Sequence, residues 1–151
     1  MTSLTFLSSL NALIFGVISG LHVYWGFCAL FGIKSENMTS VVPEIHGRPV
    51  FVPSAVSTFL VALVLGLAAF ISLRSLTVFN ENFTIFPVWI VYGNLVISVI
   101  FLIRAIGEFK YVGFFKKVKG TLFAKNDTLF YSPLCLLISI VALFIFLKIR
   151  N

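Results

Sequence analysis

Four long runs of apolar residues constrain this chain more than any other feature. They cover about residues 5–33, 53–73, 87–108 and 132–148, and few charged side chains interrupt them. A stretch of about 20 apolar residues is long enough to cross a bilayer as a helix. Hydrophobic residues make up 60% of the chain and charged residues only 11%, which is outside the usual range of soluble proteins. The sequence therefore predicts an all-α integral membrane protein with four transmembrane helices in an up-down antiparallel bundle.

Length limits the number of domains. Four spans and their connections use almost all of the 151 residues, so we expect residues 1–151 to form a single transmembrane domain. Pro53 suits the first turn of the second helix, and Ser132 followed by Pro133 suits the start of the fourth. We expect the first run to be retained rather than removed as a signal peptide, because no Lys or Arg precedes it and it is too long for a signal sequence.

Basic residues are unevenly divided between the two sides of the predicted bundle. The connections 34–52 and 110–125 together carry seven Lys and Arg, whereas the connection 74–86 and the C-terminal end together carry three. Short cytoplasmic loops of membrane proteins carry an excess of Lys and Arg. This bias predicts that both termini lie on the non-cytoplasmic side.

Polar side chains in and beside the apolar runs indicate a site on the cytoplasmic side. Arg104 and Glu108 are spaced one helical turn apart at the end of the third run. His22 interrupts the first run, and an imidazole in an apolar helix needs a polar partner. The predicted ligand-binding residues are His22, Trp25, Arg104, Glu108, Asp127 and Tyr131, with Arg48, Asn94 and Ser132 as secondary candidates.

Two pairings within this predicted cluster follow from charge. We expect Arg104 to pair with Asp127 or Glu108, and His22 to pair with Glu108 or Tyr131. The alternative is that these residues only tie the helices together, as polar contacts in membrane bundles commonly do at about 0.6–2 kcal/mol each.

Several kinds of chemistry are weakly supported by the sequence. Cys28 and Cys135 are isolated and form no CxxC motif, so thiol–disulfide exchange is disfavoured. His22 and His46 are far apart and belong to no Cys/His cluster, so no metal site is predicted. The chain also contains no phosphate-binding Gly-rich motif and no GxSxG motif. We predict no cofactor and no nucleic-acid partner.

Two segments suggest contacts outside the bundle. The segment 108–125 interleaves Lys with Tyr and Phe, which favours a membrane surface with anionic headgroups near Lys110, Lys116, Lys117 and Lys119. An ordinary positively charged loop that only sets topology explains the same segment. Gly16 and Gly20 form a GxxxG pair, a pattern that favours close helix packing and a possible homo-oligomer.

Four short motifs carry a family resemblance. They are H-x-x-W-G in the first run, RPVFVP before the second, RAIGEFKYVGFF at the end of the third and NDTLFYSPLC at the start of the fourth. Together they resemble the bacterial family of small four-helix membrane proteins named domain of unknown function 3995. The resemblance implies a four-helix fold and a bacterial inner membrane, with an acidic residue at the position of Glu108. It implies no activity.

Three classes of function remain open on this basis. The first is a pocket that holds an amphipathic molecule such as a lipid, quinone or isoprenoid, in which Arg104 fixes the polar group and His22, Glu108 or Asp127 exchanges protons. The second is a non-enzymatic subunit or scaffold in which the polar cluster is structural. The third is an oligomeric small-molecule transporter. Whether the protein is an enzyme is not decided by the sequence.

Overall fold

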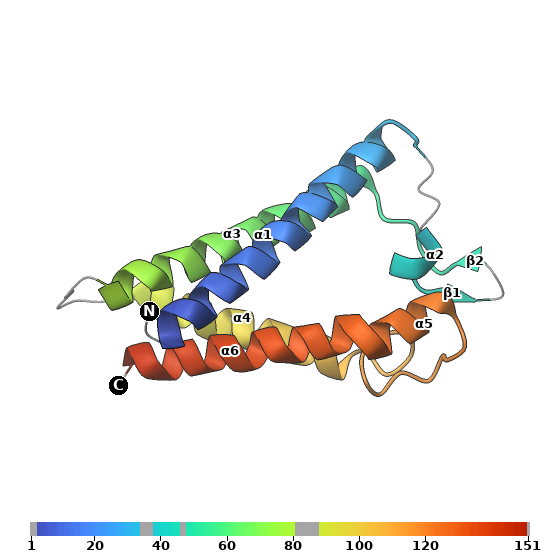
Figure 1. The fold of residues 1–151 in the computed structure, drawn as a ribbon. Helices are drawn as coiled ribbons and strands as arrows, with labels where there is room; N and C mark the ends of the chain where they lie inside the picture. Colours follow the sequence, from blue (N-terminus) through green and yellow to red (C-terminus); the bar gives the residue numbers. More distant parts are fainter. Residues whose placement is uncertain (1–2, 34–37, 46–47, 81–87, 151) are drawn as a thin grey trace.

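The computed structural model describes residues 3–33, 38–45, 48–80 and 88–150 (Figure 1). His46 and residue 87, the predicted start of the third run, lie outside these residues. The elements in chain order are α1 (Ser3–Leu30), α2 (Met38–Val41), β1 (Glu44–Ile45), β2 (Arg48–Pro49), α3 (Ala55–Asn80), α4 (Val88–Ile106), α5 (Leu122–Asn126), the π-helix η1 (Asp127–Tyr131) and α6 (Ser132–Arg150).

Four helical segments in the described chain are long and apolar enough to cross a membrane. They are Leu4–Leu30, Ala55–Leu76, Val88–Ile106 and the continuous helix Leu122–Arg150. Large apolar side chains, among them Leu13, Leu63, Ile103 and Ile140, are exposed along these helices. Soluble monomers rarely expose apolar faces of this extent. The predicted all-helical protein with four membrane-type helices is confirmed at this level.

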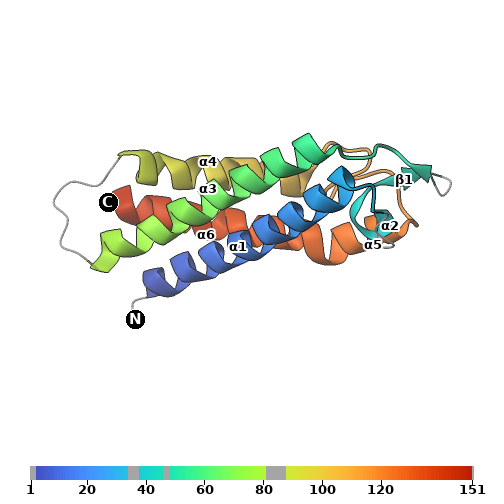
Figure 2. The same cartoon turned by 90° about the horizontal axis from the view of Figure 1, so that it is seen from above.

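The long helices pack as two pairs, α1 with α3 and α4 with α6. α3 returns along α1 and α6 returns along α4, and both chain ends lie at the same end of the molecule (Figure 1). The pairs converge toward that end and separate toward the end that carries α2, β1 and β2. Figure 2 shows the same helices from above, with α2, β1 and α5 gathered beyond the ends of the helices.

An apolar core joins the two pairs near the middle of the bundle. Phe15 of α1 is fully buried and meets Phe101 of α4 edge to face, with ring centroids 5.2 Å apart. Leu65 of α3 and Ile97 of α4 pack in the same cluster. Buried aromatic and aliphatic contacts of this kind hold the pairs together where they converge.

Hydrogen bonds donated by polar side chains reinforce three of the helix contacts. Ser19 donates to the carbonyl oxygen of Ala62 at 2.8 Å, which links α1 to α3. Ser139 donates to the carbonyl oxygen of Ser98 at 2.9 Å, which links α6 to α4. Asn94 donates to the Ser75 hydroxyl at 2.9 Å and links α4 to α3. Asn94, predicted as a secondary ligand-binding residue, therefore holds helices together.

Three helix ends differ from the predicted ones. α1 ends at Leu30 rather than residue 33, because Gly32 adopts a φ of 66° and the Ile33 N–H donates to the Cys28 carbonyl at 2.9 Å, as in a Schellman cap. α3 continues past residue 73, since Arg74 is exposed on the helix surface and does not end it. α4 ends at Ile106, two residues before the predicted end.

The fourth helix begins ten residues earlier than predicted. Thr121 is its N-cap, with its hydroxyl accepting from the Ala124 N–H at 3.0 Å. The helix passes through Pro133 because residues 127–131 widen into a π-helix, in which the Ser132 N–H donates to the Asp127 carbonyl. A proline inside a regular α-helix clashes with the carbonyl four residues before it, and a wider turn relieves that clash. The expected Ser132 cap is therefore wrong.

Candidate ligand-binding site

Asp127 lies at the centre of a buried cluster of charged and polar groups. Its side chain is fully buried at the start of η1. Oδ1 accepts a hydrogen bond from Arg104 Nη2 at 3.0 Å. Oδ2 accepts from Lys116 Nζ at 2.9 Å, from the Gly113 N–H at 2.8 Å and from the Ser132 hydroxyl at 3.2 Å. The structure thus contains one of the two pairings predicted for Arg104, and Ser132 belongs to the same cluster.

A tight loop after α4 brings two of these donors to Asp127. Gly107 and Gly113 have φ values of 86° and 90°, a region that favours glycine. Their backbones approach so closely that a Cβ on Gly113 would overlap the carbonyl oxygen of Ile106. The Phe114 N–H donates back to the Ala105 carbonyl at 2.9 Å. The loop therefore folds against the end of α4 and presents the Gly113 N–H to the carboxylate.

Lys116 corrects one prediction about lipid contacts. It was expected beside lipid headgroups, but it is only 5% exposed. Besides its bond to Asp127, its Nζ donates to the Gly113 carbonyl at 3.0 Å and to the Thr128 hydroxyl at 2.7 Å. All three donor positions of the ammonium group are used inside the protein. The predicted headgroup contacts are left to Lys110, Lys117 and Lys119, which are exposed.

Glu108 does not join the cluster. Because α4 ends at Ile106 and Gly107 turns the chain, Glu108 leaves the helical face that carries Arg104. Its exposed carboxylate accepts a hydrogen bond from the Tyr111 N–H and stabilises the loop. The expected inward position of Glu108, facing His22, is wrong.

The cluster carries more positive than negative charge. Arg104 and Lys116 both pair with the single carboxylate of Asp127, so the three side chains together carry one excess positive charge. Arg104 Nη1 is buried and has no hydrogen-bond partner within the described chain. The Arg104 side chain is 35% exposed. Asp127 therefore holds one Nη nitrogen of Arg104, the other lies inside the protein without a partner, and the rest of the side chain is partly accessible.

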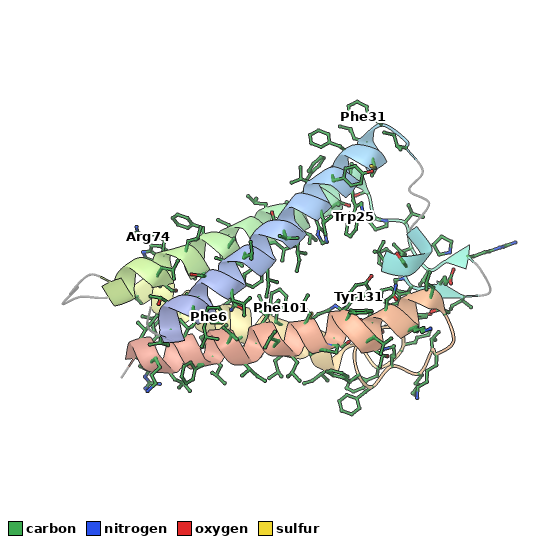
Figure 3. All side chains as sticks on the ribbon, viewed as in Figure 1. Phe6, Trp25, Phe31, Arg74, Phe101 and Tyr131 are labelled. Atoms are coloured by element: carbon green, nitrogen blue, oxygen red, sulfur yellow. The ribbon has the colours of Figure 1, made fainter. Side chains whose placement is uncertain are left out.

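Arg104 reaches one wall of a cavity between the two helix pairs. The cavity measures about 1050 Å³ and is open on one side. Its lining comes from the C-terminal half of α1, the N-terminal end of α3, Arg104 of α4, and residues 41, 42 and 51–53. Its lining is mostly apolar and includes Trp25, Val42, Phe51 and Val61. Figure 3 shows Trp25 and Tyr131 directed toward the space between the helix pairs from opposite sides, although only Trp25 is among the residues that line the cavity.

The N-terminus of α3 forms another part of the same wall. Ser54, Ala55, Ser57 and Thr58 line the cavity. The Ser54 hydroxyl caps the helix by accepting from the Ser57 N–H at 3.2 Å. The Thr58 N–H makes the first backbone bond, to the Ser54 carbonyl. The first turn contains no acidic residue, so the positive end of the dipole of this long helix lacks a compensating side chain.

His22 and Trp25 also line the cavity, as the sequence analysis expected of a ligand site. The two rings meet edge to face with centroids 5.1 Å apart. The polar contact of His22 is within its own helix, between Nδ1 and the Ile18 carbonyl oxygen at 2.8 Å. The predicted pairing of His22 with Glu108 or Tyr131 is wrong, because α4 ends before Glu108 and Tyr131 bonds elsewhere.

Tyr131 makes its polar contact at the loop end of the molecule. Its hydroxyl donates to the Ser40 carbonyl at 3.2 Å, which ties η1 to α2. The Asn126 amide reaches the same carbonyl at 3.5 Å. Arg48, a secondary candidate, is exposed on β2 and is not among the residues that line the cavity.

Gly16 and Gly20 are exposed on α1, and a Cβ on either would meet no atom within 4 Å. Gly16 lies in a shallow groove of about 440 Å³ between α1 and α3, together with Ala12 and Leu73. The predicted contact with a second copy through these glycines stays a prediction.

Sequence reasoning missed two contributors to the site. Lys116 looked like the other lysines of its loop, although the two glycines around GEFKYVG indicate a tight turn that can bury a nearby side chain. The Ser54 cap was not predicted, because Pro53 was expected in the first turn of this helix. The sequence SxxS at 54–57 is the signal for it.

Comparison with known proteins gives one match. The model of the family described as "Protein of unknown function (DUF3995)" matches residues 15–142. The match confirms the family resemblance found in the sequence, and it includes His22, Arg104 and Asp127. No curated protein and no solved structure matches.

Proposed function

We propose that this protein, which belongs to that family of unknown function, binds an amphipathic molecule with an anionic headgroup in the cavity between its helix pairs. The observation that carries the proposal is Arg104, which lines an apolar cavity and belongs to a cluster with one excess positive charge, and whose buried Nη1 has no partner in the described chain. A buried charge without a counter-ion is costly in an apolar environment. An anionic ligand supplies that counter-ion.

The proposal includes a position in the membrane. The four long helices cross the bilayer as an up-down antiparallel bundle, and Arg104, two residues from the end of α4, lies near headgroup level. The charge bias of the loops supports a cytoplasmic position for this end and a non-cytoplasmic position for both termini. The family resemblance supports a bacterial inner membrane.

The two parts of an amphiphile fit different walls of the cavity. The headgroup binds Arg104 and the N-terminus of α3, which attract negative charge. The apolar part packs on Trp25, Phe51 and Val61. Lipid and isoprenoid amphiphiles meet these requirements, and a quinone meets them only through a carbonyl group. The excess charge favours the anionic classes.

Native mass spectrometry of the purified protein tests the proposal, together with extraction and identification of bound lipid. Arg104→Ala leaves Asp127 paired with Lys116 as a neutral couple, so we expect the variant to fold and to lose the bound molecule. Arg74→Ala is the matched control, because Arg74 lies at the opposite end of the molecule (Figure 3).

Each outcome decides between the functional classes. A specific molecule retained by the wild type and by Arg74→Ala, but lost from Arg104→Ala at equal thermal stability, supports the pocket. Identical annular lipid in all three proteins rejects it and favours the scaffold reading, in which the cluster only ties helices. Uptake of a solute into vesicles that contain the protein would favour the oligomeric transporter.

A further inference from the structure

One backbone contact fixes which nitrogen of His22 carries the proton. Nδ1 lies 2.8 Å from the Ile18 carbonyl oxygen. A carbonyl oxygen accepts hydrogen bonds and cannot donate them, so Nδ1 is the protonated nitrogen in this contact. In a neutral imidazole the other nitrogen, Nε2, then carries a lone pair. His22 therefore offers a hydrogen-bond acceptor at Nε2.

The acceptor of His22 has no donor in the described part of the protein. The hydroxyls of Ser57 and Thr58, which line the same cavity, both donate to the Ser54 carbonyl, at 2.9 and 2.8 Å. The Ser54 hydroxyl donates to Ser57 at 3.0 Å. Arg104 and Cys28 are the other titratable groups along the cavity wall, and Tyr24 on the same helix is exposed. Nε2 is not one of the buried side-chain atoms that lack a partner, so it is accessible to solvent and to a ligand that supplies the hydrogen.

We propose that the ligand carries a phosphomonoester headgroup and that His22 Nε2 binds its acidic P–OH group. The inference rests on the proposed function and deepens it. Anionic phosphate oxygens bind Arg104 and the N-terminus of α3, a common anion site in proteins. The hydroxyl of the phosphate donates to Nε2. A carboxylate or a phosphodiester supplies the negative charge but lacks this acidic proton.

The proton can lie on either partner without changing the total charge. When it moves from the phosphate to Nε2, the O–H bond breaks and an N–H bond forms. The pair then consists of an imidazolium and a phosphate dianion, and the dianion remains opposite Arg104. The second pKa of a phosphomonoester is about 6, so at about pH 6 a large share of free headgroups still carries the P–OH proton.

Fluorescence of Trp25 is the readout for the test. The chain contains two tryptophans, and a Trp89→Phe background leaves Trp25 as the only one. Trp89 stacks on Phe70, with centroids 6.0 Å apart, away from the cavity lining. Phosphatidic acid, phosphatidylglycerol, oleate and inorganic phosphate are titrated in neutral detergent at about pH 6. We expect phosphatidic acid to bind at least about tenfold more tightly than the other three, since it alone combines P–OH with an apolar chain.

His22→Asn separates binding from structure. The Asn amide nitrogen occupies about the position of Nδ1 and donates to the Ile18 carbonyl, but the side chain offers no acceptor at the position of Nε2. We expect the variant to fold normally and to lose the preference for phosphatidic acid over phosphatidylglycerol. Arg104 and the α3 N-terminus are unchanged in this variant, so a preference caused by headgroup charge alone would persist.

Four results would overturn the inference. Equal binding of phosphatidic acid and phosphatidylglycerol by the wild type, or an unchanged preference in His22→Asn, rejects the role of His22. In either case the proposed function stands if Arg104→Ala still abolishes binding. Binding of inorganic phosphate as tightly as phosphatidic acid rejects the amphiphile. If no amphiphile binds the wild type, the proposed function and this inference fail together.

Discussion

Replacing Asp127 with Asn tests the charge balance of the buried cluster directly. The substitution keeps the size of the side chain but removes its negative charge, so Arg104 and the buried ammonium of Lys116 lose their shared counter-ion. The amide also has the wrong hydrogen-bonding pattern. Oδ2 accepts from three donors and Oδ1 from one, so the NH₂ group faces a donor in either orientation.

The expected loss of stability is large. Removing one partner of a buried ion pair costs about 3–5 kcal/mol, because the other charge is left uncompensated. For a chain of this size each kcal/mol corresponds to about 2–4 °C in the midpoint of thermal unfolding, so Asp127→Asn is expected to lower the midpoint by about 6–20 °C. Lys116→Met is the comparison variant. It leaves Asp127 and Arg104 as a neutral pair, and we expect no more than about half of this loss.

The two buried thiols provide the assay. Cys28 and Cys135 are free and buried, so a fluorogenic maleimide reacts with them as the protein unfolds in detergent on heating. The reasoning is refuted if Asp127→Asn unfolds at the wild-type temperature. It is also refuted if Lys116→Met is the less stable of the two variants, because the ammonium would then contribute more than the carboxylate that holds it.

Two further predictions concern the loop after α4. Gly113→Ala is expected to destabilise the protein more than Gly120→Ala in the same maleimide assay: both residues have a φ of 90°, which costs a residue with a Cβ about 1–2 kcal/mol, but only at Gly113 does a Cβ also overlap backbone atoms. Equal midpoints for the two variants would contradict the close backbone approach. Replacing Lys110, Lys117 and Lys119 together with Gln is expected to reduce the anionic lipid retained in native mass spectra, by about 1 kcal/mol per lysine, without lowering the unfolding midpoint. Unchanged lipid retention would show that these lysines only set topology.

The sequence predicted the four membrane-type helices because apolar runs of this length have few alternative structures, but it placed the start of the fourth helix ten residues too late. It also placed Arg104 and Asp127 together, since an arginine at the end of an apolar helix needs a polar or anionic partner. The partner was left undecided between Asp127 and Glu108. The choice between these partners depended on whether α4 continued for one more half turn. The helix stops instead, and Gly107 comes into close contact with the backbone at Val112.

The error at Lys116 arose because the burial of a loop residue depends on contacts distant in sequence. Lys116 is next to the exposed Lys117, and no local pattern distinguishes the two. Only the fold of the loop against Asp127, 11 residues away, buries one of them. His22 shows the opposite case. Its contact with Ile18 is local, whereas the predicted partners, Glu108 and Tyr131, are distant in sequence.

The π-helix at residues 127–131 acts as a one-residue insertion in the register of the last helix. Each residue of an α-helix turns the chain by about 100°, so deleting one residue in this segment would restore a regular helix and rotate Asp127 away from its cations. The regular helix would have better backbone geometry but would face the clash at Pro133. The orientation of the Asp127 carboxylate therefore depends on an irregular backbone. Shortening this segment by one residue would break the contacts of Asp127 with Arg104 and Lys116, although all three side chains would still be present.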